Sequence, residues 1–137
     1  MSYYDIRKAL TQSIIDLDVG LPLFYENADF KSSSVDSYIA ITTLMGDQEP
    51  MDKTGLDVVQ GIYQLSIHVK SGTSTKDLDN ATDLIMGYYI HNLKLVSGIQ
   101  TVVIVSTSTT GGRNDDGWYV NDISITFKSD ILRTLGA

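Results

Sequence analysis

The clearest hydrophobic pattern in the chain is a regular alternation near its middle. Between residues 58 and 69, four apolar side chains from Tyr63 to Val69 alternate with three polar ones. A period of two is typical of a half-buried β-strand. Gly61, near the start of this stretch, predicts a bulge or a close backbone approach. We expect this strand to lie at the centre of the sheet.

Two other stretches have the period of an amphipathic helix. The first is residues 2–17, with an apolar stripe of Ile6, Leu10, Ile14 and Leu17. It is expected to end at Gly20, which can take a positive φ, and Pro22, which cannot continue a helix. The second begins near Ser74 and fades near Asn92, and its expected buried stripe is Leu78, Ala81, Leu84, Ile85, Tyr88 and Tyr89.

The remaining segments read as strands separated by polar loops. Strands are predicted at residues 23–27, 38–45, 100–106 and 118–128. Polar loops are predicted at residues 29–37, 46–57 and 107–117. Apolar residues occur on both faces of the strands at 38–45 and 100–106, which predicts that neighbouring subunits cover part of that surface.

The predicted order of elements is α-β-β-β-α-β-β. This order indicates an α+β fold, a two-layer sandwich in which both helices pack on one face of a mostly antiparallel sheet. Residues 1–128 are expected to form one domain, because 137 residues suffice for a single core. Residues 129–137 are expected to be a C-terminal tail with the spacing of one helical turn.

Composition and charge exclude several classes of function. There is no cysteine, so disulfides and thiolate metal sites are ruled out. The first residues do not resemble a signal peptide and no apolar run could span a bilayer, so we expect a protein made in a cytoplasm without a membrane partner. A net charge of −7 argues against binding nucleic acid by phosphate neutralisation.

Candidate catalytic chemistry is sparse. His68 and His91 are the only histidines, and neither stands in a His-x-x-x-His or His-Glu-x-x-His pattern. No Gly-x-Ser-x-Gly elbow marks a nucleophile. Asp115 and Asp116 lack the closing Glu of a calcium loop, so a solvated hairpin is favoured there. The sequence therefore predicts no catalytic, cofactor-binding or metal-binding residues and no enzymatic activity.

Two groups of residues are candidates for contacts instead. The first is the acidic set Asp47, Glu49, Asp52 and Asp57, which either keeps its loop soluble or forms a wall that repels DNA phosphates. The second comprises Trp118 and Tyr119, aromatic residues beside a glycine-containing loop, together with Arg113 in that loop. Core packing is the alternative for the aromatic residues, and an interface anchor is the sharper hypothesis.

The order and spacing of several segments resemble a known family. The segments are residues 3–7, 21–30, 38–41, 60–65 and 117–120. Together they resemble the small tail terminator, or minor tail, proteins of long-tailed bacteriophages and prophages. The resemblance implies an α+β fold and a hexameric ring that stops tail-tube polymerisation and presents a surface to the head connector. It offers no catalytic residues.

Three hypotheses follow. The first is a virion structural protein of the phage tail, made in the bacterial host cytoplasm. It would be a homo-oligomeric ring with the tail tube protein and the head–tail connector protein as partners, and DNA would pass through it without specific binding. The second is another joining or tube protein, such as a head completion or tail tube subunit. The third is a small-molecule-binding or enzymatic domain that uses His68 and the 107–117 loop.

Overall fold

A computed structural model describes residues 3–25, 37–50, 56–70, 76–97, 100–115 and 117–132. Its elements, in chain order, are α1 (Tyr3–Leu17), β1 (Leu23–Tyr25), β2 (Ser37–Pro50), β3 (Leu56–Lys70), α2 (Lys76–Tyr88), β4 (Lys94–Ser97), β5 (Gln100–Asp115) and β6 (Trp118–Leu132). The strands form one six-stranded sheet in the order β1-β2-β3-β6-β5-β4. Only β1 and β2 are parallel, and the other neighbours are antiparallel.

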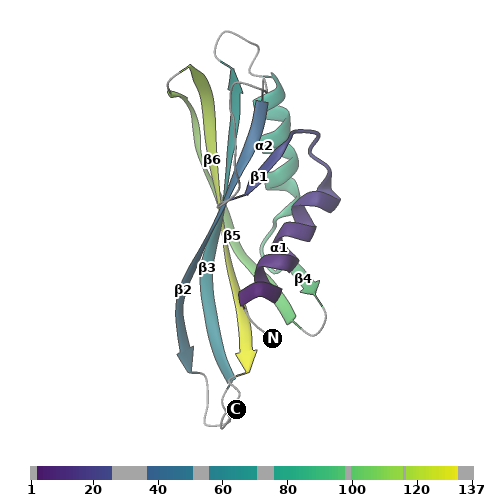
Figure 1. Cartoon of the computed structure of the whole chain (residues 1–137), viewed down its shortest axis with the longest axis vertical. Coiled ribbons are helices and arrows are strands. Elements are labelled where there is room, and N and C mark those ends of the chain that lie inside the picture. Colours follow the sequence, from purple (N-terminus) through teal and green to yellow (C-terminus); the bar gives the residue numbers. More distant parts are fainter. Residues whose placement is uncertain are drawn as a thin grey trace.

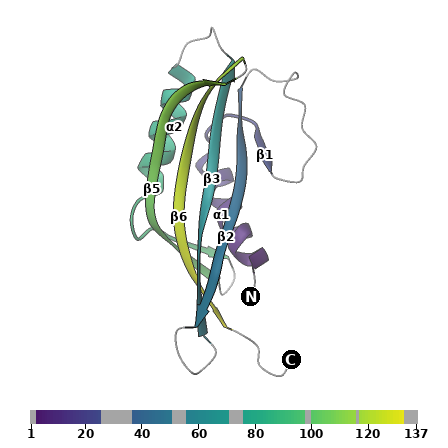
Figure 2. The same cartoon turned by 90° about the vertical axis from the view of Figure 1, so that its left-hand side faces the viewer.

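Both helices lie on the same face of a long, twisted sheet (Figure 1). In the view of Figure 2, the strands lie in front and the helices behind them, so the opposite face of the sheet is left open. The α+β fold class and the two-layer arrangement are therefore confirmed. β3 and β6 are the two central strands, as predicted for the alternating stretch.

The core forms between the helices and one face of the sheet. Strand residues with odd numbers from 59 to 69 in β3 and from 119 to 129 in β6 point toward the helix side, and they include the fully buried Tyr63, Leu65, Ile125 and Phe127. On α1, the predicted stripe is buried at Ile6, Leu10 and Ile14 and is half-buried at Leu17. The helix is followed by Asp18 and Gly20, both at positive φ, and the prediction for Gly20 is thus confirmed.

The stripe of α2 differs from the prediction at one position. Leu78, Ala81 and Ile85 are buried, whereas Leu84 is exposed. Successive helical residues are turned by about 100°, so Leu84 points well away from the direction of Ile85. The prediction that Leu84 is buried is therefore wrong.

Buried polar groups join the layers through hydrogen bonds. The Asn121 amide nitrogen of β6 donates to Thr82 Oγ1 on α2 at 2.8 Å, and its oxygen accepts from Thr109 Oγ1 on β5 at 2.6 Å. Thr82 Oγ1 in turn donates to the Leu78 carbonyl. This chain of bonds fixes the position of α2 over the β5–β6 pair, since an unmet buried amide would be costly.

A second polar contact joins α1 to the chain just after α2. The hydroxyls of Ser13 and Tyr89 are 2.6 Å apart, and Ser13 also donates to the Leu10 carbonyl. Burial raises the pKa of Tyr89 above its ordinary value of 10.0. The unfolded chain therefore releases this proton first as the pH rises.

This shift predicts a loss of stability in alkali. The contribution of Tyr89 is fully present below pH 10 and falls by about 1.4 kcal/mol per pH unit above it. Urea unfolding between pH 8 and about pH 11 should give a shallower decline for Tyr89→Phe than for the wild type. Tyr4→Phe, at a residue 69% exposed on α1, is the matched control and should follow the wild type. Parallel curves for wild type and Tyr89→Phe would contradict the assignment.

Four strands, β2, β3, β5 and β6, are longer than predicted, and one strand was not predicted. β5 continues to Asp115, so most of the expected 107–117 loop is strand. Its β-branched threonines pair with β6, and the two glycines that suggested a loop lie at a register shift, where Gly111 has φ 81°. β6 continues to Leu132, so the start of the expected tail is strand and residues 133–137 lie outside the described residues. The additional strand is β4, four residues long.

The expected 46–57 loop is also largely strand. β2 continues to Pro50 and β3 begins at Leu56, and their pairing shifts register between Met45 and Gln48. Gly61 on β3 lies beside this shift. A Cβ at this position would be 2.5 Å from the Leu44 carbonyl oxygen and 2.7 Å from the Phe127 ring. The predicted close backbone approach at Gly61 is therefore confirmed.

Candidate assembly surface

The face of the sheet opposite the helices is mainly polar. By strand alternation it carries hydroxyl and amide side chains at Thr42, Gln64, Ser66, Ser106, Ser108, Ser124 and Thr126. Apolar side chains interrupt it at Leu44, 52% exposed, and Ile62, 37% exposed. On β2 itself this face carries Tyr38, Ala40 and Leu44, so the strand at 38–45 does have apolar residues on both faces. That neighbouring subunits cover them stays a prediction. We call this surface the open face.

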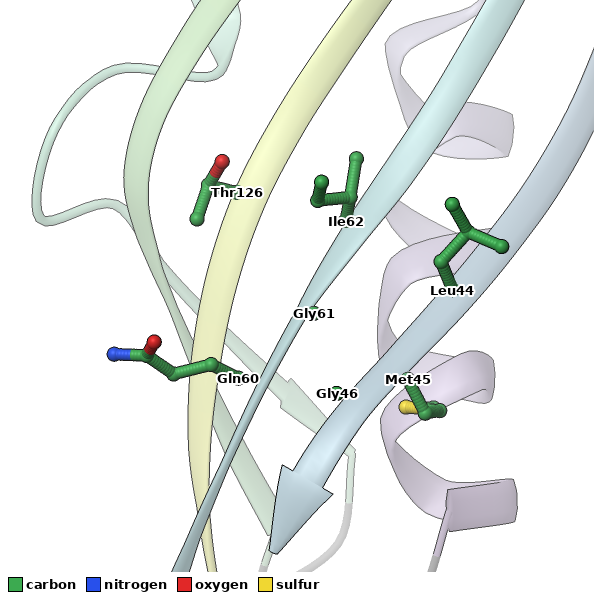
Figure 3. Close-up of a pocket in the computed structure, with 7 residues that line it drawn as sticks. All are labelled: Leu44, Met45, Gly46, Gln60, Gly61, Ile62 and Thr126. Carbon is green, nitrogen blue, oxygen red and sulfur yellow. The ribbon is translucent and has the colours of Figure 1, made fainter.

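Leu44 and Ile62 border a depression in the open face. It is lined by Leu44, Met45, Gly46, Gln60, Gly61, Ile62 and Thr126 and has a volume of about 330 Å³. Figure 3 shows Leu44, Ile62 and Thr126 projecting from the sheet on the side away from the helices. Two glycines belong to this lining, and both lie where the backbones of β2 and β3 are close: a Cβ on Gly46 would collide with the Gln60 carbonyl, and one on Gly61 would approach the Leu44 carbonyl oxygen.

An aromatic cluster occupies another part of the open face. The His68 ring is stacked on the Tyr38 ring with centroids 4.3 Å apart and planes 9° apart. Trp118 and Phe24 meet Tyr38 edge-on at 5.1 Å and 5.7 Å. His68 Nδ1 lies 3.0 Å from the Ser66 carbonyl oxygen. This histidine is therefore part of an aromatic contact that joins β1, β2, β3 and β6.

The predicted contact residues do not lie on one face. Trp118 and Arg113 occupy the open face, and the Arg113 guanidinium bonds to the Asp122 carboxylate at 2.7 Å. Asp122 also accepts from Ser66 Oγ at 2.6 Å. Tyr119 lies on the helix side, half-buried against the core. Of the three, Trp118 and Arg113 remain proposals for a contact surface, and Tyr119 has the surroundings of a packing residue.

Three of the four acidic candidates lie in the ends of β2 and β3 that pair with each other. Asp47 and Glu49 belong to β2 and Asp57 to β3, with the backbone of Glu49 opposite Val58 and that of Pro50 opposite Asp57. Asp52 lies outside the described residues. Among the described residues there is no cluster of three His, Asp or Glu side chains that could hold a metal ion. Neither described helix is long and apolar enough to cross a membrane.

Both edges of the sheet are only partly covered. β1 pairs with β2 at residues 39–41 alone, and β4 pairs with β5 at residues 100–103 alone. Within the described chain, no strand pairs with the outer side of residues 44–50 of β2 or of residues 106–115 of β5. Unpaired N–H and C=O groups along such edges are a template for pairing with another chain. We call these the β2 edge and the β5 edge.

Sequence patterns did not identify these edges. A strand's position in the sheet depends on the order in which strands pair, and periodicity does not encode that order. Pro50 was the one local signal, because a proline within a strand is confined to edges, strand ends or bulges.

Comparison with known proteins gives the family. The family model of the phage tail terminator protein matches residues 5–127. A solved structure with 18% sequence identity covers 98% of this chain, and the match extends over 99% of that chain with a TM-score of 0.78. At this identity the likeness shows a shared fold. None of the curated proteins compared with the chain matches it. Because the matched model spans α1 to the middle of β6, the chain belongs to the phage tail terminator protein family.

Proposed function

We propose that the protein forms a closed ring of six identical copies at the end of the tail tube. There it stops tube growth and presents a surface to the head–tail connector protein. Membership of the terminator family supports the role at the tail. The observation that carries the ring is the pair of partly covered edges on opposite sides of one sheet.

The two edges favour a ring over a two-fold dimer. They belong to different strands, so each can pair with the other edge of the next copy in a head-to-tail contact. Such contacts close into a ring when the rotation between copies fits a whole number of subunits. Closure leaves no copy with an unpaired edge, which removes the risk of uncontrolled association.

The acidic hairpin fits a passage for DNA. Asp47, Glu49, Asp52 and Asp57 add negative charge at and beyond the paired ends of β2 and β3, in a chain whose net charge is −7. We place this end of the hairpin at the bore, where it repels phosphates and lets DNA pass without being held. Specific DNA contacts are not part of this arrangement.

A capping assay tests the role. Tail tube subunits from a phage that encodes this protein are polymerised with and without it, and the tubes are examined by electron microscopy. We expect tubes that stop growing, with the protein at one end only. Incorporation along the length would identify a tube subunit instead. Unchanged growth with no bound protein would overturn the terminator role.

A further inference from the structure

The two sides of the sheet are complementary in shape. Each has a step, formed by one short outer strand next to a stretch that no described strand covers. β1 pairs with residues 39–41 of β2. When the strand pairing is followed across β3 and β6, these residues lie at the same level as residues 109–112 of β5, within the β5 edge. β4 pairs with residues 102 and 103 of β5, among others. Followed across β6 and β3, these two residues lie at the same level as the register shift before Gln48, within the β2 edge. Each short outer strand therefore projects at a level where no described strand covers the opposite side of the sheet.

We propose that these steps interlock between neighbouring copies, and this inference rests on the proposed ring. β4 of one copy lies along the β2 edge of the next, while β1 of that next copy lies along the β5 edge of the first. A rotation without any shift along the strands brings both pairs together. A closed ring requires this property, because a shift would produce an open helix.

The strand directions are compatible with hydrogen bonding at both steps. β4 runs opposite to β5, β5 opposite to β6, β6 opposite to β3, and β3 opposite to β2. Consequently β4 and the β2 of the next copy run parallel, and β5 and the next copy's β1 run antiparallel. Both arrangements form regular ladders.

The residue types are also complementary where β4 of one copy would lie along the β2 edge of the next. Lys94 and Val96 alternate with the buried Leu95 on β4, and both are exposed, Val96 by 65%. On β2, Leu44 is exposed, and the sequence after the register shift contains two acidic residues, Asp47 and Glu49. Lys94 pairs with Val103, Val103 with Lys128, and Lys128 with Gln60. Gln60 lies opposite the register shift between Met45 and Gln48 of β2. The backbone of Lys94 in one copy would thus lie at the level of Asp47 in the next.

Charge reversal and its repair test this contact. Lys94→Glu and Asp47→Lys are each expected to raise the concentration at which half of the protein is in rings by about tenfold, because every seam then holds like charges. The double variant Lys94→Glu/Asp47→Lys should restore the wild-type value. Lys8→Glu, at an exposed position on α1, is the control and should assemble normally. Circular dichroism establishes that each variant is folded.

A cysteine pair gives a second readout that does not depend on charge. The chain has no cysteine of its own. Val96→Cys protein mixed with Glu49→Cys protein should form a disulfide-linked dimer under mild oxidation, because both residues lie at one level of the joined sheet. Val96→Cys mixed with Ser108→Cys should not, since Ser108 lies at the level of Thr42, well away from the level of β4.

The outcomes separate this inference from the proposed function. Repair of assembly in the double variant and the selective disulfide support the interlocking steps. Rings that form without either effect overturn the steps and leave the ring in place. A wild-type protein that stays monomeric both in solution and on tail tubes overturns the ring and the steps together.

Discussion

Replacing Phe127 with alanine is expected to lower the free energy of unfolding by about 3–5 kcal/mol. Phe127 is fully buried on β6, one of the two central strands, and is paired with Gly61 on one side and Ile104 on the other. Truncation removes the ring and leaves a cavity on the core side of the sheet, beside Gly61, that long, paired strands cannot collapse to fill.

Urea unfolding measures this loss directly. Lys128→Ala changes the neighbouring residue, which is exposed, and should alter the unfolding free energy by no more than about 0.5 kcal/mol. A loss below about 1 kcal/mol for Phe127→Ala would show that the centre of the sheet is not packed as described.

Replacing Gly61 with alanine is expected to cost about 2–3 kcal/mol, in the upper part of the range for overpacking. The added Cβ would be 2.5 Å from the Leu44 carbonyl oxygen and 2.7 Å from the Phe127 ring. A ring can turn aside, whereas a carbonyl within a strand ladder cannot move without breaking hydrogen bonds. The strain therefore remains even where Phe127 adapts.

Gly87→Ala is the matched control for this substitution. Gly87 lies near the end of α2, and a Cβ there would have no neighbour within 4 Å. The same chemical change should stabilise the protein by about 0.5–1 kcal/mol, because alanine favours the helix. Equal effects at the two glycines in denaturant unfolding would contradict the close approach of β2 and β3.

The helices and the central strand could be predicted because their burial follows their local period. Ile6, Leu10 and Ile14 recur once per helical turn, and the residues of β3 alternate in burial from Val58 to Lys70. Gly61 was informative because a glycine inside such an alternation often marks a bulge or a close backbone approach. These features depend on neighbours along the chain.

The extensions of β2 and β5 could not be predicted for a different reason. Gly111-Gly112 and the acidic run after Gly46 have turn composition, yet both lie at register shifts in long antiparallel pairs. Their strand conformation is imposed by the partner strands, which override local preference. β4 was missed because only four residues pair and they follow closely on the end of α2.

The candidate surface was predictable in its chemistry and not in its geometry. The acidic set, Trp118 and Arg113 were identified from composition, and the resemblance indicated the family that the comparison then showed. The partly covered edges and the place of His68 beside Tyr38 arise from strand order and register. Residues far apart in the sequence meet there, so no local pattern could predict them.

The most direct test of a ring closed by sheet edges is native mass spectrometry of the purified protein over a range of concentrations. We predict one dominant assembly with six times the 15.1 kDa mass of the chain, in equilibrium with monomer and without larger species. A ladder of ever larger oligomers, or a protein that remains monomeric even when tail tubes are present, would contradict the ring.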